Sequence, residues 1–349
     1  MSIANSHERN TYVDALRGIA MLMVVLQHTM VGCTDGAEQS FLFQIVWSLQ
    51  MPLFMLISGY VTRYSRRINS GKALVGFIWK RTTAYLWPWL VWTVIIRGLV
   101  FGNRSFLNPS HILWHMDSGY WFLFSIWTIS MAFGISQFCA NVIIRNKSDA
   151  ARILSTGTIY GLSMVLLAGI GYVFGLSFLC IKLTLYYMPF YFLGYLFGQS
   201  QEHLFEHKHA NKCVELVVGV AFILWIVILS RYNLYEISDS GFGIIVRAAA
   251  SLAGCIAVCG LMNNVRQSNG TANYGGGILW CGKHSLEIYL VHYLVLNLLQ
   301  TQTKPQFLTV QGLTVLLVNL AVTLLATWTI VILVNRNKLL RGFIFGKRA

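Results

Sequence analysis

Long apolar runs recur along the whole chain, and this feature restricts the possible fold more than any other. Ten runs close to the roughly 20 residues that cross a bilayer occur at 13–33, 42–62, 82–101, 120–139, 153–174, 178–198, 213–230, 242–262, 278–300 and 308–334. Backbone groups in lipid must be satisfied internally, which leaves helices or closed barrels. The run LVVGVAFILWIVILS at 216–230 does not alternate in polarity as a barrel strand would. We therefore expect an all-α, polytopic transmembrane bundle of about ten spans.

The low content of charged residues agrees with a chain that lies in lipid. Charged side chains make up 11% of the 349 residues, against about 25% in an ordinary soluble domain. This excludes a soluble enzyme, because such a chain has too little polar surface to coat a water-soluble globule. The chain carries 26 Lys and Arg against 12 Asp and Glu. That excess is typical of cytoplasmic loops in membrane proteins, so no nucleic-acid partner is expected.

The distribution of the cations predicts the orientation of the chain. With the N-terminus inside, nineteen Lys and Arg fall in inner segments, and the outer loops hold Arg104, Arg231 and Lys304. This bias predicts that both termini are cytoplasmic. We expect a membrane domain over 10–335 and a basic cytoplasmic tail over 336–349. The seven Cys lie mostly inside apolar runs without accompanying ligand pairs, so no metal site is predicted.

The first apolar run carries three ionisable residues: Asp14, Arg17 and His28. Ionisable groups at membrane depth are costly unless they face a partner or a wet cavity, so they point to function. Asp14 and Arg17 are three apart and share a helix face. Arg17 and His28 are eleven apart, which places them on one stripe about 16 Å apart along the axis. A cation at the cytoplasmic mouth and an imidazole beyond the midplane thus lie on one face.

An imidazole at this position suits proton transfer. The unperturbed pKa of histidine, about 6.5, allows it to take and return a proton near neutrality. His28 can act as a base toward a hydroxyl that attacks a thioester, or as a nucleophile that carries the acyl group. The structural alternatives are a snorkelling Arg17 and a His28 that bonds to a neighbouring helix. The shared stripe favours the functional interpretation.

Two other spans carry polar residues of interest. The second span ends LQMPLFMLISGY, where Pro52 predicts a kink and Ser58 with the following glycine permits close helix packing. The ninth span contains GKHSLEIYLVHYLVL, with Glu287 and His292 inside it. These two are five apart, about 140° around a helix, so we expect them to face different neighbours. A structural interhelical hydrogen bond is the alternative for His292.

A dense set of cations follows the second span. Six lie between positions 63 and 81, and the candidates for anion binding are Arg63, Arg66, Arg67 and Arg81. Arginines of this kind can clamp phosphates or anionic lipid headgroups. The positive-inside bias explains the same residues without any ligand, so the sequence leaves both interpretations open.

Taken together, these elements resemble acyltransferase family 3, integral membrane proteins that transfer acyl groups, often acetyl, to cell-surface sugars and related acceptors. The most specific match is the Arg, ten residues, His spacing in DALRGIAMLMVVLQH. The segments MPLFMLISGY, KRTTAYLWPWL, GYWFLFSIW, YFLGYLFG and GKHSLEIYLVH are similar to later elements in the same order. The resemblance covers about 10–335. MPLFMLISGY is most similar to the branch related to fucose O-acetylases, in which a His often precedes Met-Pro. Here that position is Gln50.

The resemblance implies an O-acyltransferase of a bacterial inner membrane. The implied donor is acetyl-CoA, the implied acceptor is a hydroxyl of a surface or lipid-linked carbohydrate, and no tightly bound cofactor is implied. In this interpretation His28 is the base or transient acyl carrier, and Asp14 with Arg17 shapes the entrance. The four arginines hold the donor phosphates. A transporter or flippase for a glycan or anionic metabolite is the main alternative. It predicts internal repeats, which the sequence does not show.

Overall fold

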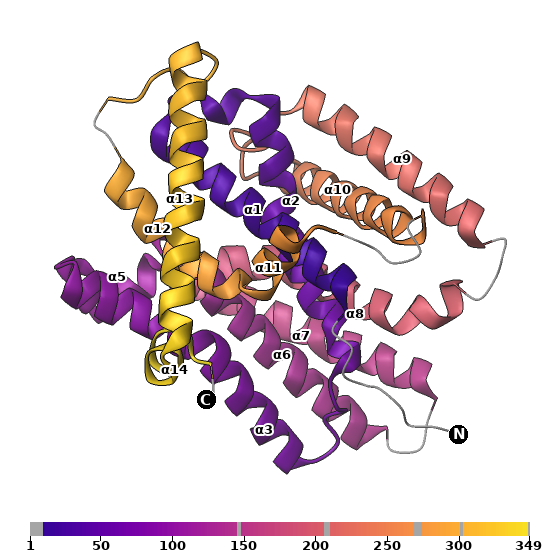
Figure 1. The fold of residues 1–349 in the computed structure, drawn as a ribbon. Helices are drawn as coiled ribbons and strands as arrows, with labels where there is room; N and C mark the ends of the chain where they lie inside the picture. Colours follow the sequence, from indigo (N-terminus) through magenta and orange to yellow (C-terminus); the bar gives the residue numbers. More distant parts are fainter. Residues whose placement is uncertain (1–9, 145–147, 206–209, 269–273, 301–302, 348–349) are drawn as a thin grey trace. The chain divides into compact units, whose positions relative to one another are not determined.

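The computed structural model describes residues 10–144, 148–205, 210–268, 274–300 and 303–347, which form helices joined by short loops (Figure 1). Within these ranges the only β-type contact is an isolated bridge between Asp35 and Gln306. Nine helices of the described segments are long and apolar enough to cross a membrane. The expectation of an all-α, multi-pass membrane protein is therefore confirmed.

The α-helices have the following bounds: α1 Thr11–Cys33, α2 Phe41–Tyr60, α3 Gly71–Arg81, α4 Trp87–Leu90, α5 Pro109–Trp114, α6 Trp121–Ile143, α7 Asp149–Phe174, α8 Ile181–Phe205, α9 Ala210–Arg231, α10 Gly241–Ser268, α11 Gly276–Lys283, α12 Ser285–Leu299, α13 Val310–Arg336 and α14 Lys338–Phe345. The chain divides into two compact units. The first unit comprises 1–57 and 200–332, and the second comprises 58–199 and 333–349.

In the first unit, α1 packs on α11 through two glycines. Gly18 faces the backbone of Ile278 and Gly282 faces the backbone of Asp14, so a Cβ on either glycine would overlap those atoms. In lipid, apolar side chains gain little by leaving the acyl tails, so close backbone packing at small residues is what joins helices. These two contacts therefore fix α1 against the α11–α12 segment.

One end of the first unit gathers the loops that we expect on the outer side. The backbone N–H of Asp35 donates to Pro305 O at 3.0 Å. The Gln44 amide donates to Asn233 Oδ1 at 2.8 Å and accepts from the Leu234 N–H at 2.8 Å. Three loops far apart in sequence thus lie on one side, as an alternating topology requires. Helices α9 and α10 lie side by side in this unit (Figure 1).

In the second unit, side-chain contacts likewise connect the loops that we expect on the inner side. The Arg67 guanidinium lies 3.3 Å from the Asp149 carboxylate, and the Asn141 amide donates to Ile68 O at 3.0 Å. At the other end of this unit, the Trp114 indole donates to the carbonyl oxygen of Phe174, the last residue of α7, at 3.4 Å. Some cations counted on the inner side lie outside the described residues: Arg9, Arg145, Lys147, Lys208 and Arg348.

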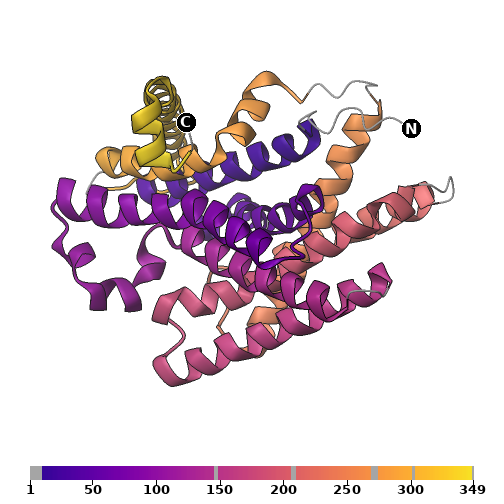
Figure 2. The same ribbon diagram turned by 90° about the horizontal axis from the view of Figure 1, so that it is seen from below.

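The third span begins earlier than the expected 82–101. The structure places a continuous helical segment from Gly71 to Val100, and Figure 2 shows it as one unbroken ribbon. The segment starts at Ser70, whose side chain accepts from the Ala73 N–H at 3.2 Å, as an N-cap does. The expected inner loop at 63–81 is therefore corrected. Its second half is helical, because Ser70 caps a helix that continues through the cationic residues up to Arg81.

The same segment widens on both sides of a proline. Thr82–Leu86 and Val91–Val100 are π-helical, and Pro88 lies in the α-helical turn between them. A proline inside a helix clashes with the carbonyl four residues before it and lacks an N–H. The i to i+5 pattern of a π-helix accommodates this clash and is frequent at functional sites.

The ninth span is not the single helix expected at 278–300. Helix α11 ends at Lys283 and α12 begins at Ser285, while His284 between them has φ −111° and ψ 22°. The His284 N–H still donates to the Trp280 carbonyl at 3.0 Å, which closes α11, and the non-helical angles of His284 then separate it from α12. The segment expected as a basic tail holds α14, whose backbone carbonyls at Phe343 and Ile344 accept from two indoles of the second unit.

Candidate functional site

Helix α1 carries three of the expected site residues. It begins at an N-cap, Asn10, whose side chain accepts from the Val13 N–H at 3.3 Å. Asp14 is buried and 7% exposed, and Arg17, one turn further along, is half-buried. His28 lies near the opposite end, about 16 Å along the axis from Arg17. The helix therefore places the cation and the imidazole near its two ends, as the sequence indicates.

The His28 ring lies beside a second imidazole from α12. The centroids of the His28 and His292 rings are 5.3 Å apart, with an interplanar angle of 42°. The Tyr293 ring meets His28 edge-on at 5.7 Å. His28 is half-buried. Within the described part of the chain, no group of three His, Cys, Asp or Glu side chains is placed to hold a metal ion.

His292 belongs fully to the interior of the first unit. Its exposure is 1%, and its Nδ1 lies 2.8 Å from the Ile288 carbonyl oxygen one turn earlier. The Nε2 atom is buried and has no hydrogen-bond partner among the described residues. The sequence predicts that His292 and Glu287 meet different neighbours, and the neighbour of His292 on α1 is His28.

Glu287 is a buried carboxylate at the start of α12. Its side chain is 1% exposed, and its Oε1 lies 3.1 Å from the Nδ1 of His284 at the helix break. His284 was not among the site residues expected from the sequence. Its position three residues before Glu287 is the signal that would have found it, because residues three apart in a helix share a face.

Gln50 and Ser58 lie on α2 in different units. Gln50 is 5% exposed, and its Oε1 lacks a hydrogen-bond partner within the described ranges. Ser58 is 8% exposed and precedes Gly59, which faces the backbone of Tyr191 so closely that a Cβ would overlap it. Ser58 therefore lies next to a packing contact made by Gly59, whereas Gln50 presents a buried polar atom.

Three of the four candidate arginines lie in the loop after α2, in the second unit. The Arg63 guanidinium stacks on the rings of Tyr60 at 5.7 Å and Tyr64 at 5.3 Å. Arg66 is exposed. Arg67 pairs with Asp149, and both side chains are more than 60% exposed. The loop thus presents its cations mainly to solvent.

Arg81 differs from the loop arginines because it lies within the helical segment. It is the last residue of α3 and is half-buried. Its guanidinium lies over the Phe77 ring at 5.3 Å and donates to the Tyr85 hydroxyl at 3.1 Å. One turn of helix on each side therefore fixes its direction.

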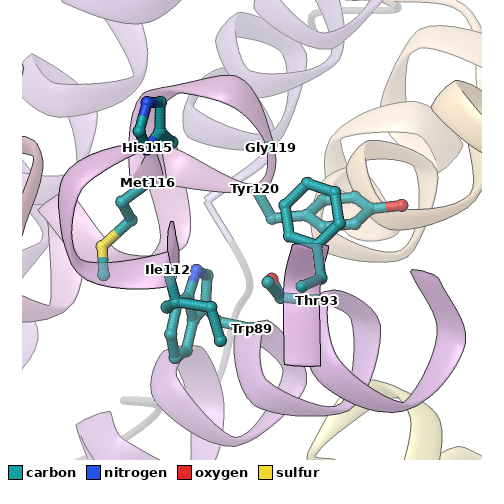
Figure 3. Close-up of a pocket in the computed structure, with 8 residues that line it drawn as sticks. Trp89, Thr93, Ile112, His115, Met116, Gly119 and Tyr120 are labelled. Atoms are coloured by element: carbon teal, nitrogen blue, oxygen red, sulfur yellow. The ribbon is translucent and has the colours of Figure 1, made fainter. Parts of the chain in front are cut away.

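The second unit also contains a small cavity, lined in part by the π-helical segment Val91–Val100 (Figure 3). Its lining residues are Trp89, Thr93, Phe106, Ile112, His115, Met116, Gly119 and Tyr120. Its volume is about 10 Å³, which is room for roughly one water molecule. None of the expected site residues lines it, and the space is too small for a sugar ring.

Two curated proteins are similar to this chain, and both are named nodulation protein NolL. The protein of Sinorhizobium fredii is 26% identical over 224 residues, covering 59% of this chain and 54% of its own length. That of Mesorhizobium japonicum is 27% identical over 206 residues, covering 56% of this chain and 50% of its own. The chain thus spans about half the length of these relatives. No solved structure matches it significantly.

The family comparison covers much more of the chain. A family model described as an acyltransferase domain matches residues 10–334. The match includes the helices that carry Arg17, His28, Glu287 and His292, and it also includes the basic segment after α2. Because the match extends over nearly all of the sequence, the chain belongs to acyltransferase family 3.

Proposed function

We propose that this protein is an O-acyltransferase of a bacterial inner membrane that moves acetyl from acetyl-CoA to a carbohydrate hydroxyl. The acceptor is a surface or lipid-linked glycan. The observation that carries the proposal is the His28 ring, which lies half-buried in an apolar helix beside His292. An imidazole kept in such a place costs stability, and acyl transfer needs a base there.

The chemistry requires little beyond this base, because a thioester is already activated. A nitrogen of His28 takes the proton of the acceptor hydroxyl while its oxygen attacks the thioester carbonyl. The C–S bond then breaks, the new ester keeps the acyl group, and the thiolate leaves. The imidazolium returns its proton to the thiolate, so His28 is regenerated. The apolar surroundings of α1 exclude water that would compete with the hydroxyl.

The positive groups serve the donor in this proposal. Arg17 and the buried Asp14 lie at the end of α1 away from His28, where they shape an entrance. Among the four arginines Arg81 suits a phosphate best, because Phe77 and Tyr85 hold its guanidinium in one direction. Arg66 and Arg67 lie on an exposed loop, where the positive-inside bias explains them equally well.

Mass spectrometry of surface glycans tests this function. Glycans from cells with the gene should carry an acyl substituent that cells without it lack. Complementation with the wild-type gene should restore the mass difference, whereas His28→Ala should not. Identical glycan masses in all strains would contradict the proposal.

A further inference from the structure

His292 is a buried imidazole whose hydrogen bonding is incomplete. Its Nδ1 lies 2.8 Å from the Ile288 carbonyl oxygen, and a carbonyl can only accept. Nδ1 therefore carries the ring proton, which leaves Nε2 with a lone pair. The residue is 1% exposed, and Nε2 finds no partner in the described part of the chain. Unsatisfied buried polar atoms are rare in native proteins and call for an explanation.

The neighbour best placed to explain this lone pair is His28. The ring centroids lie 5.3 Å apart, a separation that side-chain rotation can turn into a hydrogen bond between ring nitrogens. Among the described residues no hydrogen bond engages the His28 ring, and its ring contacts are with His292 and Tyr293. The carboxylate on the same helix, Glu287, contacts His284 instead. His28 thus has an imidazole beside it where many catalytic histidines have a carboxylate.

We propose that His292 is a positioning residue for His28, an inference that rests on the proposed function. Its Nε2 accepts the N–H of the His28 ring, so the other nitrogen of His28 keeps its lone pair toward the acceptor hydroxyl. Fixing the tautomer and direction of a base in this way is the task of the third member of a catalytic triad. A neutral imidazole performs it without burying a charge in an apolar helix pair.

The Ile288 contact completes this arrangement. If His292 carried its proton on Nε2, it would present a donor to His28 and would leave Nδ1 without the proton that the Ile288 carbonyl needs. The backbone of α12 therefore selects the tautomer of His292, and His292 in turn selects that of His28. A phenylalanine or leucine would fill the same volume, so packing alone does not require a histidine here.

Two substitutions separate this role from a purely structural one. An asparagine amide lies near the position of Nδ1, so His292→Asn can still donate to Ile288 O but has nothing at the position of Nε2. A glutamine amide reaches the position of Nε2, so His292→Gln keeps an acceptor for His28 and loses the Ile288 contact. We expect kcat to fall roughly 10-fold or more in His292→Asn, less than for loss of the base itself. His292→Gln should retain most of kcat, and KM should change little in both.

A merely structural role predicts the opposite order, with His292→Asn close to wild type and His292→Gln impaired. That order, or equal kcat in all three proteins, would overturn the proposal. The assay uses purified full-length protein in lipid nanodiscs, with thermal unfolding of each variant measured alongside. If the wild type itself transfers no acyl group, the proposed function fails instead.

A second readout does not depend on turnover. Diethylpyrocarbonate acylates the lone-pair nitrogen of histidine, and mass spectrometry of the peptide around His28 gives the rate. A hydrogen bond from His28 to His292 raises the nucleophilicity of the opposite nitrogen, so modification should slow several-fold in His292→Asn and stay near wild type in His292→Gln. Equal rates in the three proteins would contradict the positioning role.

Discussion

The histidine pair of the first unit and the arginine-rich segment of the second are built in opposite ways. His292 is 1% exposed and touches His28 in a region of apolar helices. Arg66 and Arg67 are exposed, and Arg67 pairs with a carboxylate that is itself 67% exposed. Removing one buried polar group has a large effect, because its hydrogen-bond partner is left buried without a substitute. Removing one exposed cation has a small effect, because its neighbours keep the local positive charge and salt screens them all.

The contrast implies that single substitutions have large effects in the first region and small effects in most of the second. Arg81 is the exception to this rule. It belongs to the basic segment by sequence but is half-buried between Phe77 and Tyr85.

The largest effect is expected at His28. His28→Ala should lower kcat by about 10²- to 10⁴-fold, the usual contribution of a general base. The protein should still insert and fold, because an alanine removes a polar group from an apolar helix. Acyl transfer by purified variants, normalised to folded protein, provides the measurement. Wild-type turnover by His28→Ala would remove the base from the mechanism.

The next effect concerns the packing that holds α1. Gly282→Ala places a Cβ against the backbone of Asp14 and should destabilise the protein by about 1–3 kcal/mol, as overpacking does. Gly277→Ala, on the same helix with nothing near its Cβ, is the matched control. Thermal unfolding in detergent should separate them clearly. Equal stability of the two variants would mean that the α1–α11 contact is not tight.

The third effect distinguishes Arg81 from the exposed arginines of the loop after α2. If Arg81 holds a donor phosphate, Arg81→Ala should raise the donor KM about 10-fold, in the range of a charged hydrogen bond. Arg66→Ala should leave it within about two-fold, since the exposed loop keeps its other cations. The acceptor KM should not move in either variant. Equal donor KM values for both variants and the wild type would mean that these arginines set the membrane orientation and do not bind the donor.

The smallest effect is expected at the surface ion pair. Arg67→Ala should change stability by less than about 1 kcal/mol, because exposed pairs contribute little and Asp149 keeps its pairing with Arg152. Moderate salt should reduce even this difference. Unfolding midpoints in low and high salt measure it. A larger loss would show that the loop joins the helices as firmly as the glycine contacts do.

The sequence predicted the parts of the fold that depend on apolar length and charge bias. The first span was expected at 13–33 and forms Thr11–Cys33, because a continuous apolar run follows a capping Asn10. The all-α, multi-pass architecture follows from similar runs. The stripe that carries Arg17 and His28 follows from helix geometry alone.

Other features depend on contacts that a single sequence does not reveal. The π-helical segments around Pro88 and the break at His284 interrupt apolar stretches that look continuous. Periodicity shows which face of α1 carries His28 but not which helix it meets, so the contact with His292 was not predictable. Arg81 was assigned to a loop because its cationic neighbours resemble one, whereas the cap at Ser70 extends the helix through it.

Acyl transfer with His28 as the base is tested most directly with the purified protein in proteoliposomes. These should contain acetyl-CoA labelled on its acetyl group and a lipid-linked glycan acceptor. Label should appear on the glycan with one CoA released per ester formed, and His28→Ala should abolish both. Passage of unmodified glycan across the bilayer, with no CoA released, would contradict the account and identify a transporter.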